Sequence, residues 1–533
     1  MTQAITDVGR QEVLSRLPGL EERLAGIGDV EECRRLFHGM LAELGAGCSS
    51  VRMHRALSVL ETVTGRWAEE LTGVPVMGTL AALANGRTEG VSQGFLFELD
   101  GLLSALAGSE EAEGPPVGEA ASLFLTRYPA GTDRDVYRRR HKNRVRILNR
   151  LGGSPSQWDD WIWQTRNTVR DRVLLAELIP LSEGEKAGLD AAEAAGVRWS
   201  VTPYYLSLFD DDPGELFDRS LRNRVLPPTT AVKATDDGGE AGGAQLLVER
   251  LNPFSALVKP CLASPQYSCY EPPPTELDVT DSKLRSALEW FGDNPEVWEA
   301  VIGGGDVLCL TDSKVEGILA GLSRYKHIRR ILIRSDFPVV MPPRFTALLT
   351  KIISRHVKPT QLEVGLVSRF CHAYEVTPEA VTVITRLRKS GVTVYNEALY
   401  TVDNMRRFEF AALRWALQGA RIETSYSRLK TGALKSGVPL ARVLQELREE
   451  ASLFPAQENA QVPVVETASG ETVPLWGDRE LVSIRPGDGR RVYLYRTAGG
   501  TVLDTDTALA EFLEGMRERG EDPADYAGLR EYV

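Results

Sequence analysis

Six β-rich runs, each followed by an amphipathic stretch, dominate the chain from about residue 256 onward. The runs are SALVKP, AVIGG, RRILIRS, QLEVGLV, VTVYN and ARIETSY. Such alternation is typical of a parallel sheet, because parallel strands need a crossover helix to connect them. Six units rather than eight predict an α/β fold, an open, three-quarter βα barrel of about six parallel strand–helix units. Its functional groups are expected at the C-terminal ends of the strands.

Composition divides the rest of the chain. Apolar residues at helical spacing predict a helical N-terminal domain, and the acidic stretch GSEEAEGPPVGEA has the composition of a linker. After the barrel, short runs such as VPVVET, ELVSI and VYLYRT predict a small β-rich segment that ends in a helix. The predicted segments are the N-terminal domain 1–107, the linker 108–135, a helical and aromatic lead-in 136–250, the barrel 251–452 and the C-terminal segment 453–533.

The charge balance disfavours several partners. With 62 basic and 74 acidic residues, the net charge is -12, which works against non-specific binding to nucleic acid or anionic membranes. No stretch approaches the roughly 20 apolar residues that a spanning helix needs, and the N-terminus lacks the pattern of a secretory signal. Six cysteines are too few for a disulfide scaffold in a chain of 533 residues. We therefore expect a cytoplasmic protein without membrane or nucleic-acid partners.

A basic run, YRRRHKNRVRILNR, extends from Tyr137 to Arg150. It could contact a phosphate backbone, or it could be the solvated face of a helix. In an acidic chain the second interpretation is favoured. The closely spaced Trp158, Trp161 and Trp163 are interpreted as packing residues rather than catalytic groups.

Three motifs carry a resemblance to a known family. They are WDDWIWQTRN (158–167), VTPYYLSL (201–208) and IGGGDVLCLTD (302–312). Further fragments follow in order: FPVVMPPRFT, HAYEVTPEA, GVTVYNEAL and VPVVET. This ordered set resembles the lysine 2,3-aminomutase family over residues 155–500. The resemblance implies a [4Fe-4S] cluster, held by three thiolates in a CxxxCxxC motif after the first barrel strand, that cleaves S-adenosylmethionine. It also implies pyridoxal phosphate (PLP) bound to a lysine in a late glycine-rich loop.

The cluster motif is altered in this chain. The sequence after the first barrel strand is CLASPQYSCYEPPP, in which Cys261 occupies the first ligand position but Pro265 and Ser268 occupy the other two. Proline cannot ligate a metal, and serine is a poor replacement for a thiolate. An unconventional cluster would use Cys261, Cys269 and Cys309. The favoured alternative is that these are ordinary cysteines, which behave as small hydrophobic residues.

The PLP-binding loop is altered as well. Glu471 stands where the family has its lysine, and a carboxylate cannot form an imine. Lys430 and Lys435 could substitute, although we interpret them as solvated lysines. Arg250 is the candidate phosphate contact at the position of an upstream arginine of the family. No cofactor is therefore expected, and S-adenosylmethionine, the cluster and PLP belong to the alternative hypothesis.

Candidate ligand-binding residues follow the ends of predicted strands. The glycine-rich end of the second strand corresponds to the family motif that contacts S-adenosylmethionine, although such a sequence can also be a tight turn with an N-cap aspartate. Acidic side chains among the candidates predict a barrel mouth that favours an ammonium group. The predicted ligand-binding residues are Gly304, Gly305, Asp306, Asn396, Glu397, Tyr426 and Glu466.

Two classes of function remain open. The first is a degenerate family member that binds a small amino-acid-like or nucleotide-like molecule, or a protein partner, without radical chemistry. The second is an enzyme, either an aminomutase with an unconventional cluster or one repurposed for another amino-acid reaction. The two altered motifs favour the first class. The expected partner is an amino-acid-like ligand, with a second copy of the chain or another protein left open.

Overall fold

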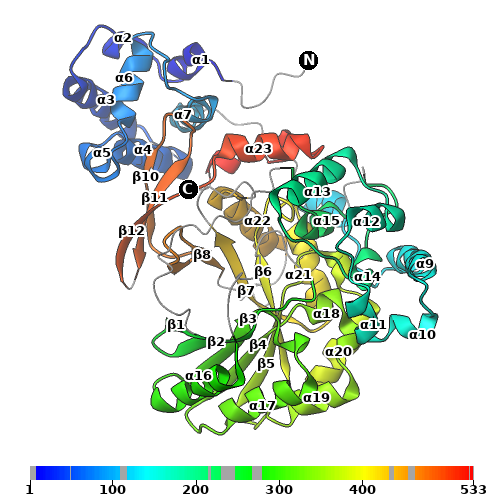
Figure 1. Cartoon of the computed structure of the whole chain (residues 1–533). Helices are drawn as coiled ribbons and strands as arrows, with labels where there is room; N and C mark the ends of the chain where they lie inside the picture. The colour runs from blue at the N-terminus through cyan, green and yellow to red at the C-terminus, as the bar shows by residue number, and fades with distance from the viewer. Residues whose placement is uncertain are drawn as a thin grey trace. The chain divides into compact units, whose positions relative to one another are not determined.

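The computed structural model of the chain describes residues 8–48, 50–107, 117–213, 218–229, 247–266, 279–430, 437–453, 463–497, 499–526 and 528–531 (Figure 1). The chain divides into two compact units. The first contains Met1–Phe124, Leu399–Phe410 and Ser427–Val533, and the second contains Leu125–Ala398 and Ala411–Tyr426.

Each of the six predicted runs forms a strand, which confirms the α/β class. The strands are β2 (Ser255–Cys261), β3 (Glu299–Gly304), β4 (Arg330–Arg334), β5 (Glu363–Ser368), β6 (Thr393–Leu399) and β7 (Glu423–Lys430). Strands β2 to β6 pair in parallel. The helices of the six units are α16 (Asp281–Asp293), α17 (Asp312–Ser323), α19 (Ala347–Ser354), α20 (Pro378–Lys389), α21 (Glu409–Gly419) and α22 (Leu440–Leu453).

The strand count differs from the prediction, since the sheet has nine strands in the order β1 to β9. At one edge β1 (Val248–Asn252) is antiparallel to β2. At the other edge β8 (Val464–Glu466) is parallel to β7, and β9 (Thr472–Pro474) is antiparallel to β8. The predicted partial barrel is confirmed as a curled sheet (Figure 1). Strand β8 lies within the predicted run VPVVET. Strand β1 is polar and β9 is only three residues long, so no apolar periodicity marks those two.

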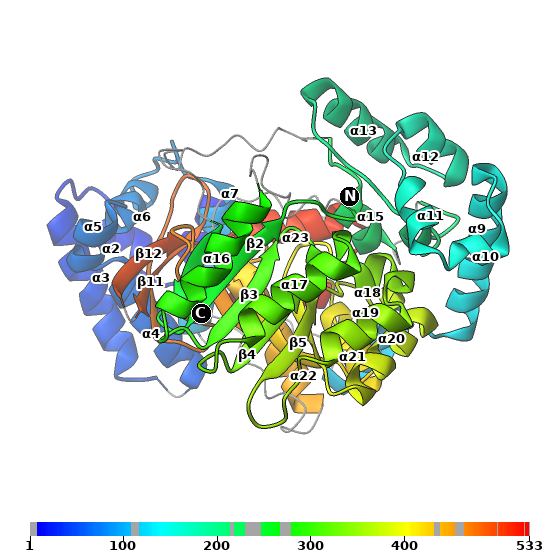
Figure 2. The same ribbon diagram turned by 60° about the horizontal axis from the view of Figure 1, so that its bottom comes forward.

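The barrel strands of the second unit have two different faces. Helices α16, α17, α19 and α20 cover one face (Figure 2). Val258 and Ile333 are fully buried and alternate along their strands with Leu257 and Leu332, so they lie on the opposite face to those two residues. On the other face, Leu257, Val301, Leu332 and Val367 form an apolar cluster against which Tyr395 packs. Side chains two residues further along each strand lie on this same face, because side chains alternate along a strand.

The lead-in helices of the second unit are α9 (Arg134–Leu151), α10 (Pro155–Trp158), α11 (Trp161–Arg166), α12 (Arg172–Leu178), α13 (Glu183–Ala195), α14 (Pro203–Leu206) and α15 (Arg219–Val225). Trp158 and Trp163 are buried, as expected of packing residues. The interpretation of the basic run as a solvated face holds for only one side of α9. Arg138 is exposed, whereas Arg140 is only 4% exposed and pairs with Glu379 of α20 at 3.1 Å.

The first unit joins N-terminal helices to the C-terminal segment. Its helices are α1 (Arg10–Ser15), α2 (Leu20–Leu24), α3 (Val30–Gly45), α4 (Val51–Val63), α5 (Arg66–Thr72), α6 (Val76–Ala84) and α7 (Gln93–Leu106), followed by α8 (Val117–Leu125) at the boundary between the units. A three-stranded antiparallel sheet, β10 (Arg479–Ile484), β11 (Arg491–Thr497) and β12 (Gly500–Thr505), precedes α23 (Leu509–Glu518).

These two parts of the first unit pack on each other. Helices α4 and α5 contact β10, and α7 contacts α23. Glu98 of α7 and Arg491 of β11 form an ion pair at 2.9 Å in which both side chains are only 2% exposed. The contacts therefore group the chain across the predicted boundaries at residues 107 and 453. Linker residues 108–116 lie outside the described residues.

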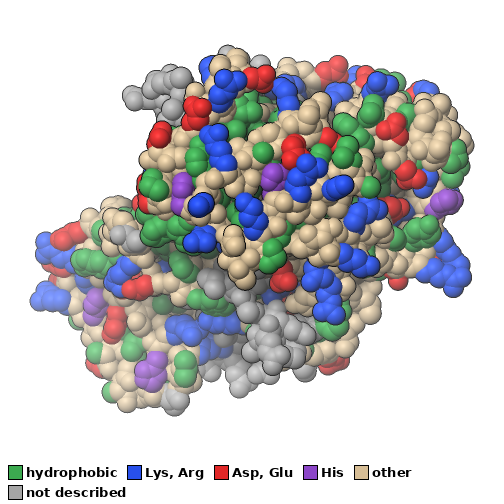
Figure 3. Space-filling view, turned by 90° about the horizontal axis from the view of Figure 1, so that it is seen from below, with side chains coloured by type: hydrophobic (Ala, Val, Ile, Leu, Met, Phe, Trp, Pro, Cys, Tyr) green, Lys and Arg blue, Asp and Glu red, His purple; other side chains and the backbone are tan. Residues whose placement is uncertain are grey.

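The surface in Figure 3 carries interspersed acidic, basic and apolar side chains. Within the described parts of the chain, no helix combines the length and the apolar character needed to span a membrane.

Candidate functional site

The glycine-rich motif joins the C-terminal ends of β2 and β3. Gly304 ends β3 with a φ of 90°, in the left-handed region that favours glycine. The backbone N–H of Gly305 donates to the carbonyl of Cys261 at 2.8 Å, and that of Asp306 donates to Ala263 at 2.8 Å. A Cβ atom at Gly305 would lie 2.6 Å from the backbone of Leu262. Both glycines are therefore required by the close approach of the chain after β2.

Asp306 points into the protein. One carboxylate oxygen accepts hydrogen bonds from the hydroxyl of Ser335 at 2.9 Å and from the N–H of Asp336 at 2.8 Å. The other accepts from the N–H of Leu308 at 3.0 Å. Burial, with a further contribution from the nearby Asp336, raises the pKa of Asp306 to about 7. The carboxylate thus fastens the end of β4 to the turn after β3.

A buried chain of charges extends from this turn to the lead-in helices. Asp336 accepts from Arg369 at 3.0 Å and lies 3.5 Å from Arg224 of α15. Arg224 also pairs with Glu375 at 2.8 Å, and Glu375 accepts from the hydroxyl of Tyr205 at 2.7 Å. Sequence analysis missed these residues, because nothing in their local sequence marks them as partners.

The raised pKa of Asp306 makes stability depend on pH. The unfolded chain loses this proton near the ordinary value of 3.8, whereas the folded chain keeps it to about pH 7. Between these values the folded state binds more protons, so this group lowers the free energy of unfolding as the pH rises. We expect Asp306→Asn to remove the part of the decline in the free energy of unfolding that Asp306 causes. Urea unfolding of the variant and of wild type, at pH values between 3.8 and about 7, measures the difference.

The matched control is Asp506→Asn in the first unit. Burial raises the pKa of Asp506 to about 7 as well. The free energy of unfolding of Asp306→Asn should therefore still decline with rising pH by the amount that Asp506 causes, and Asp506→Asn should show the converse. If the free energy of unfolding of Asp306→Asn changes with pH as that of the wild type does, Asp306 does not cause the decline.

Asn396 and Glu397 lie side by side on β6 but face different surroundings. Asn396 accepts from the N–H of Phe370 at 2.7 Å and donates to its carbonyl at 3.1 Å, so it holds the segment after β5 in place. Glu397 lies 3.5 Å from the guanidinium of Arg334 at the end of β4. Sequence analysis missed Arg334, although the alternation of Arg330, Leu332 and Arg334 in RRILIRS places them on one face.

Side chains of the two neighbouring strands pack closely over Gly303. Gly303 lies between them on β3, and a Cβ atom there would be 3.0 Å from Leu257 and 3.4 Å from Arg334. Lys259 pairs with Glu249 at 2.6 Å. A polar layer of Lys259, Arg334 and Glu397 therefore lies above the apolar cluster, at the C-terminal ends of the strands.

The other predicted site residues are placed differently. Glu466 of β8 belongs to the first unit, where it pairs with Arg428 at 2.8 Å and Lys430 at 3.5 Å. Tyr426 lies in β7, and its side chain is outside the described residues. Arg250 of β1 donates to Glu296 at 2.6 Å and lies over the ring of Trp290. Gly304, Gly305, Asp306, Asn396 and Glu397 all belong to the second unit, at or just beyond the C-terminal ends of β3 and β6.

The described residues do not fit an iron–sulfur cluster. The thiol of Cys261 accepts from the N–H of Ala263 at 3.3 Å, and burial raises the pKa of both Cys261 and Cys309. Among the residues that the structure describes, no three His, Cys, Asp or Glu side chains converge as metal ligands. Ser268 and Cys269 lie outside the described residues, whereas Pro265 lies within them.

The described residues do not fit a covalent PLP site either. Glu471 lies in the turn between β8 and β9, where its carbonyl accepts from the N–H of Thr467 at 2.8 Å. Lys430 is paired with Glu466 rather than solvated, and Lys435 lies outside the described residues.

The fold and the strand-end groups define a partial βα-barrel protein, and comparison with known proteins gives its relatives. No family model matches the chain. It is 26% identical to an uncharacterized KamA family protein of Methanocaldococcus jannaschii, over 98% of this chain and 97% of that protein. The resemblance to the lysine 2,3-aminomutase family that the motifs predicted is confirmed by further relatives.

Several of these relatives are named as aminomutases, among them the following two. The L-lysine 2,3-aminomutase of Acetoanaerobium sticklandii is 28% identical over 46% of this chain, and the match spans 60% of that enzyme, less than two thirds of its length. The glutamate 2,3-aminomutase of Clostridioides difficile is 24% identical over 54% of this chain and 68% of that enzyme.

Proposed function

We propose that the chain is an aminomutase-like protein that binds an amino-acid-like, ammonium-bearing small molecule at the C-terminal ends of the barrel strands. We further propose that it does so without standard radical S-adenosylmethionine chemistry. The observation that carries the proposal is the pair of Arg334 and Glu397, which lies above an apolar layer beside Gly303. Ligands of βα barrels bind at this end of the strands.

The pair is complementary to the two charges of an amino acid. A guanidinium binds a carboxylate through paired N–H donors, and a carboxylate accepts from an ammonium. The separation of 3.5 Å between Arg334 and Glu397 is longer than a strong charge-assisted hydrogen bond. The side chain of Arg334 is 39% exposed, so a ligand can reach it. The carboxylate of an amino acid bound here would pair with Arg334 and its ammonium group with Glu397. These two interactions would replace the 3.5 Å contact between Arg334 and Glu397.

The absence of radical chemistry is supported by the residues at the two family motifs. Pro265 cannot ligate iron, and Glu471 cannot form the imine that holds PLP. Lys430, a substitute for the missing lysine, already has a carboxylate partner at 3.5 Å.

We expect Glu397→Gln to weaken binding of an α-amino acid by about 10- to 100-fold in Kd, because it replaces a charge-assisted hydrogen bond with a neutral one. Lysine and glutamate are the first ligands to test by isothermal titration calorimetry. The matched control is Glu296→Gln, an exposed glutamate that pairs with Arg250. Equal affinity in wild type and Glu397→Gln, or no binding of any amino acid to wild type, would contradict the proposal.

The second candidate is an active aminomutase or a repurposed amino-acid-modifying enzyme with an unconventional cluster. The named activities of the relatives favour it, as does the position of Cys261 and Cys309 at the ends of neighbouring strands or just beyond them. Iron content separates the two candidates.

A further inference from the structure

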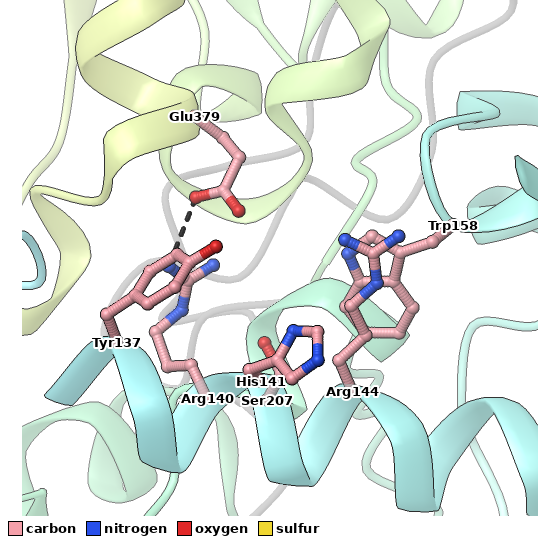
Figure 4. Close-up of a pocket in the computed structure, with 7 residues that line it drawn as sticks. All are labelled: Tyr137, Arg140, His141, Arg144, Trp158, Ser207 and Glu379. Carbon is pink, nitrogen blue, oxygen red and sulfur yellow. Dashed lines mark hydrogen bonds and ion pairs between the residues drawn. The ribbon is translucent and has the colours of Figure 1, made fainter. Parts of the chain in front are cut away.

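Helix α9 carries four side chains that face a pocket in the second unit. Tyr137, Arg140, His141 and Arg144 are spaced i, i+3, i+4 and i+7, so they form one stripe on the helix. The pocket, a shallow hollow of about 20 Å³, is also lined by Trp158, Ser207 and Glu379 (Figure 4). This volume is about that needed to hold one water molecule, so a single small group, such as one oxygen of an oxyanion, fits within it.

Arg140 has donors that the protein does not use. It is 4% exposed, yet its only hydrogen bond to the described residues runs from Nη1 to Glu379 at 3.1 Å. Its Nε is buried with no hydrogen-bond partner among those residues. A guanidinium has five N–H donors, and leaving them unpaired in a buried position costs free energy. Arg140 therefore lines the pocket and has at least one N–H donor without a hydrogen-bond partner among the described residues.

His141 and Arg144, on the same helix, also have nitrogen atoms that can donate hydrogen bonds. Figure 4 shows His141 between Arg140, which extends toward Glu379, and Arg144, which extends toward Trp158. His141 makes no hydrogen bond with the described residues, and Arg144 donates to the carbonyl of Pro155 at 3.0 Å while lying over the ring of Trp158. Two guanidinium groups thus face the pocket, Arg140 paired with Glu379 at 3.1 Å and Arg144 lying 4.0 Å from the exposed carboxylate of Asp159.

We propose that this pocket binds a small oxyanion, the phosphate or carboxylate group of a small molecule, between Arg140, His141 and Arg144. The buried Nε of Arg140 has a donor to offer to an oxyanion, and the partly buried setting strengthens each charge-assisted hydrogen bond. The indole of Trp158 offers an apolar wall for the rest of the ligand. The site belongs to α9 rather than to the strand ends, so it does not depend on the proposed amino-acid site.

Calorimetric titration of the full chain with inorganic phosphate, and separately with acetate, tests the proposal. Ionic strength is held constant with chloride, so that screening does not imitate binding. We expect saturable binding of at least one anion, and the stronger of the two identifies a phosphate or a carboxylate ligand. Arg140→Gln and His141→Ala should each weaken it about tenfold or more, because each removes a donor to the anion.

The matched control is Arg138→Gln on the same helix, whose side chain is 60% exposed and pairs with Asp135. This variant should bind as wild type does. His141 is exposed, so its variant decides the question even if Arg140→Gln does not fold. Absence of saturable binding of both anions overturns the proposal, as does binding that His141→Ala leaves unchanged or that Arg138→Gln weakens equally.

Discussion

Replacing Glu98 by alanine is expected to lower the free energy of unfolding by about 3–5 kcal/mol, the usual cost of removing one partner of a buried ion pair. Arg491 donates to the Glu98 carboxylate from Nε at 3.1 Å and from Nη2 at 2.9 Å. The carbonyl of Arg530 accepts from the same Nη2 at 3.0 Å but carries no charge to replace the carboxylate. The variant would remove the Glu98 carboxylate from a guanidinium that is 2% exposed.

Denaturant unfolding of the full chain, followed by circular dichroism, measures this effect. The matched control is Glu70→Ala, because Glu70 pairs with Arg66 at 2.7 Å on the surface and exposed pairs contribute little. If the two variants unfold at the same denaturant concentration, the buried pair does not hold the N-terminal helices to the C-terminal strands. The same contact indicates that removing residues 1–107 would destabilise what remains of the first unit.

Anaerobic reconstitution with iron and sulfide is expected to leave the chain with far fewer than the four irons of a [4Fe-4S] cluster. Of the three thiolates that such a cluster needs, the family motif retains only Cys261, because Pro265 and Ser268 occupy the other two positions. The thiol of Cys261 is buried, and its raised pKa disfavours the thiolate that binds iron. Iron and sulfide analysis, together with the visible absorption spectrum, gives the measurement.

The Cys261→Ala variant distinguishes a cluster from loosely bound iron. Iron that this variant retains is adventitious. A content near four irons per chain that Cys261→Ala abolishes would contradict the expectation. It would show that Cys261, with Cys269 or Cys309, holds a cluster, and it would favour the enzyme over the binding protein.

The strands of the barrel and the role of its glycines could be predicted from the sequence. Apolar alternation in the runs from SALVKP to ARIETSY is a local property, and each run became a strand. The glycine pair after β3 was also recognisable as a turn, because few other residues tolerate such a close approach of the backbone. Strand β8 lies within the predicted run VPVVET, although that run was assigned to the C-terminal segment and not to the barrel sheet. The edge strands β1 and β9 were not predicted, since short or polar strands carry no periodic signal.

The direction of each charged side chain was decided by the tertiary structure. Asp306 follows a strand end, as predicted, yet it points inward to Ser335 and Asp336. Glu397 reaches the strand-end layer but meets Arg334 there, so the predicted acidic mouth is a paired one. Glu98 and Arg491 are 393 residues apart in sequence. The sequence alone determined where strands and turns form, because these depend on neighbouring residues. Ion-pair partners depend on which distant elements pack together, and only the folded chain brings them into contact.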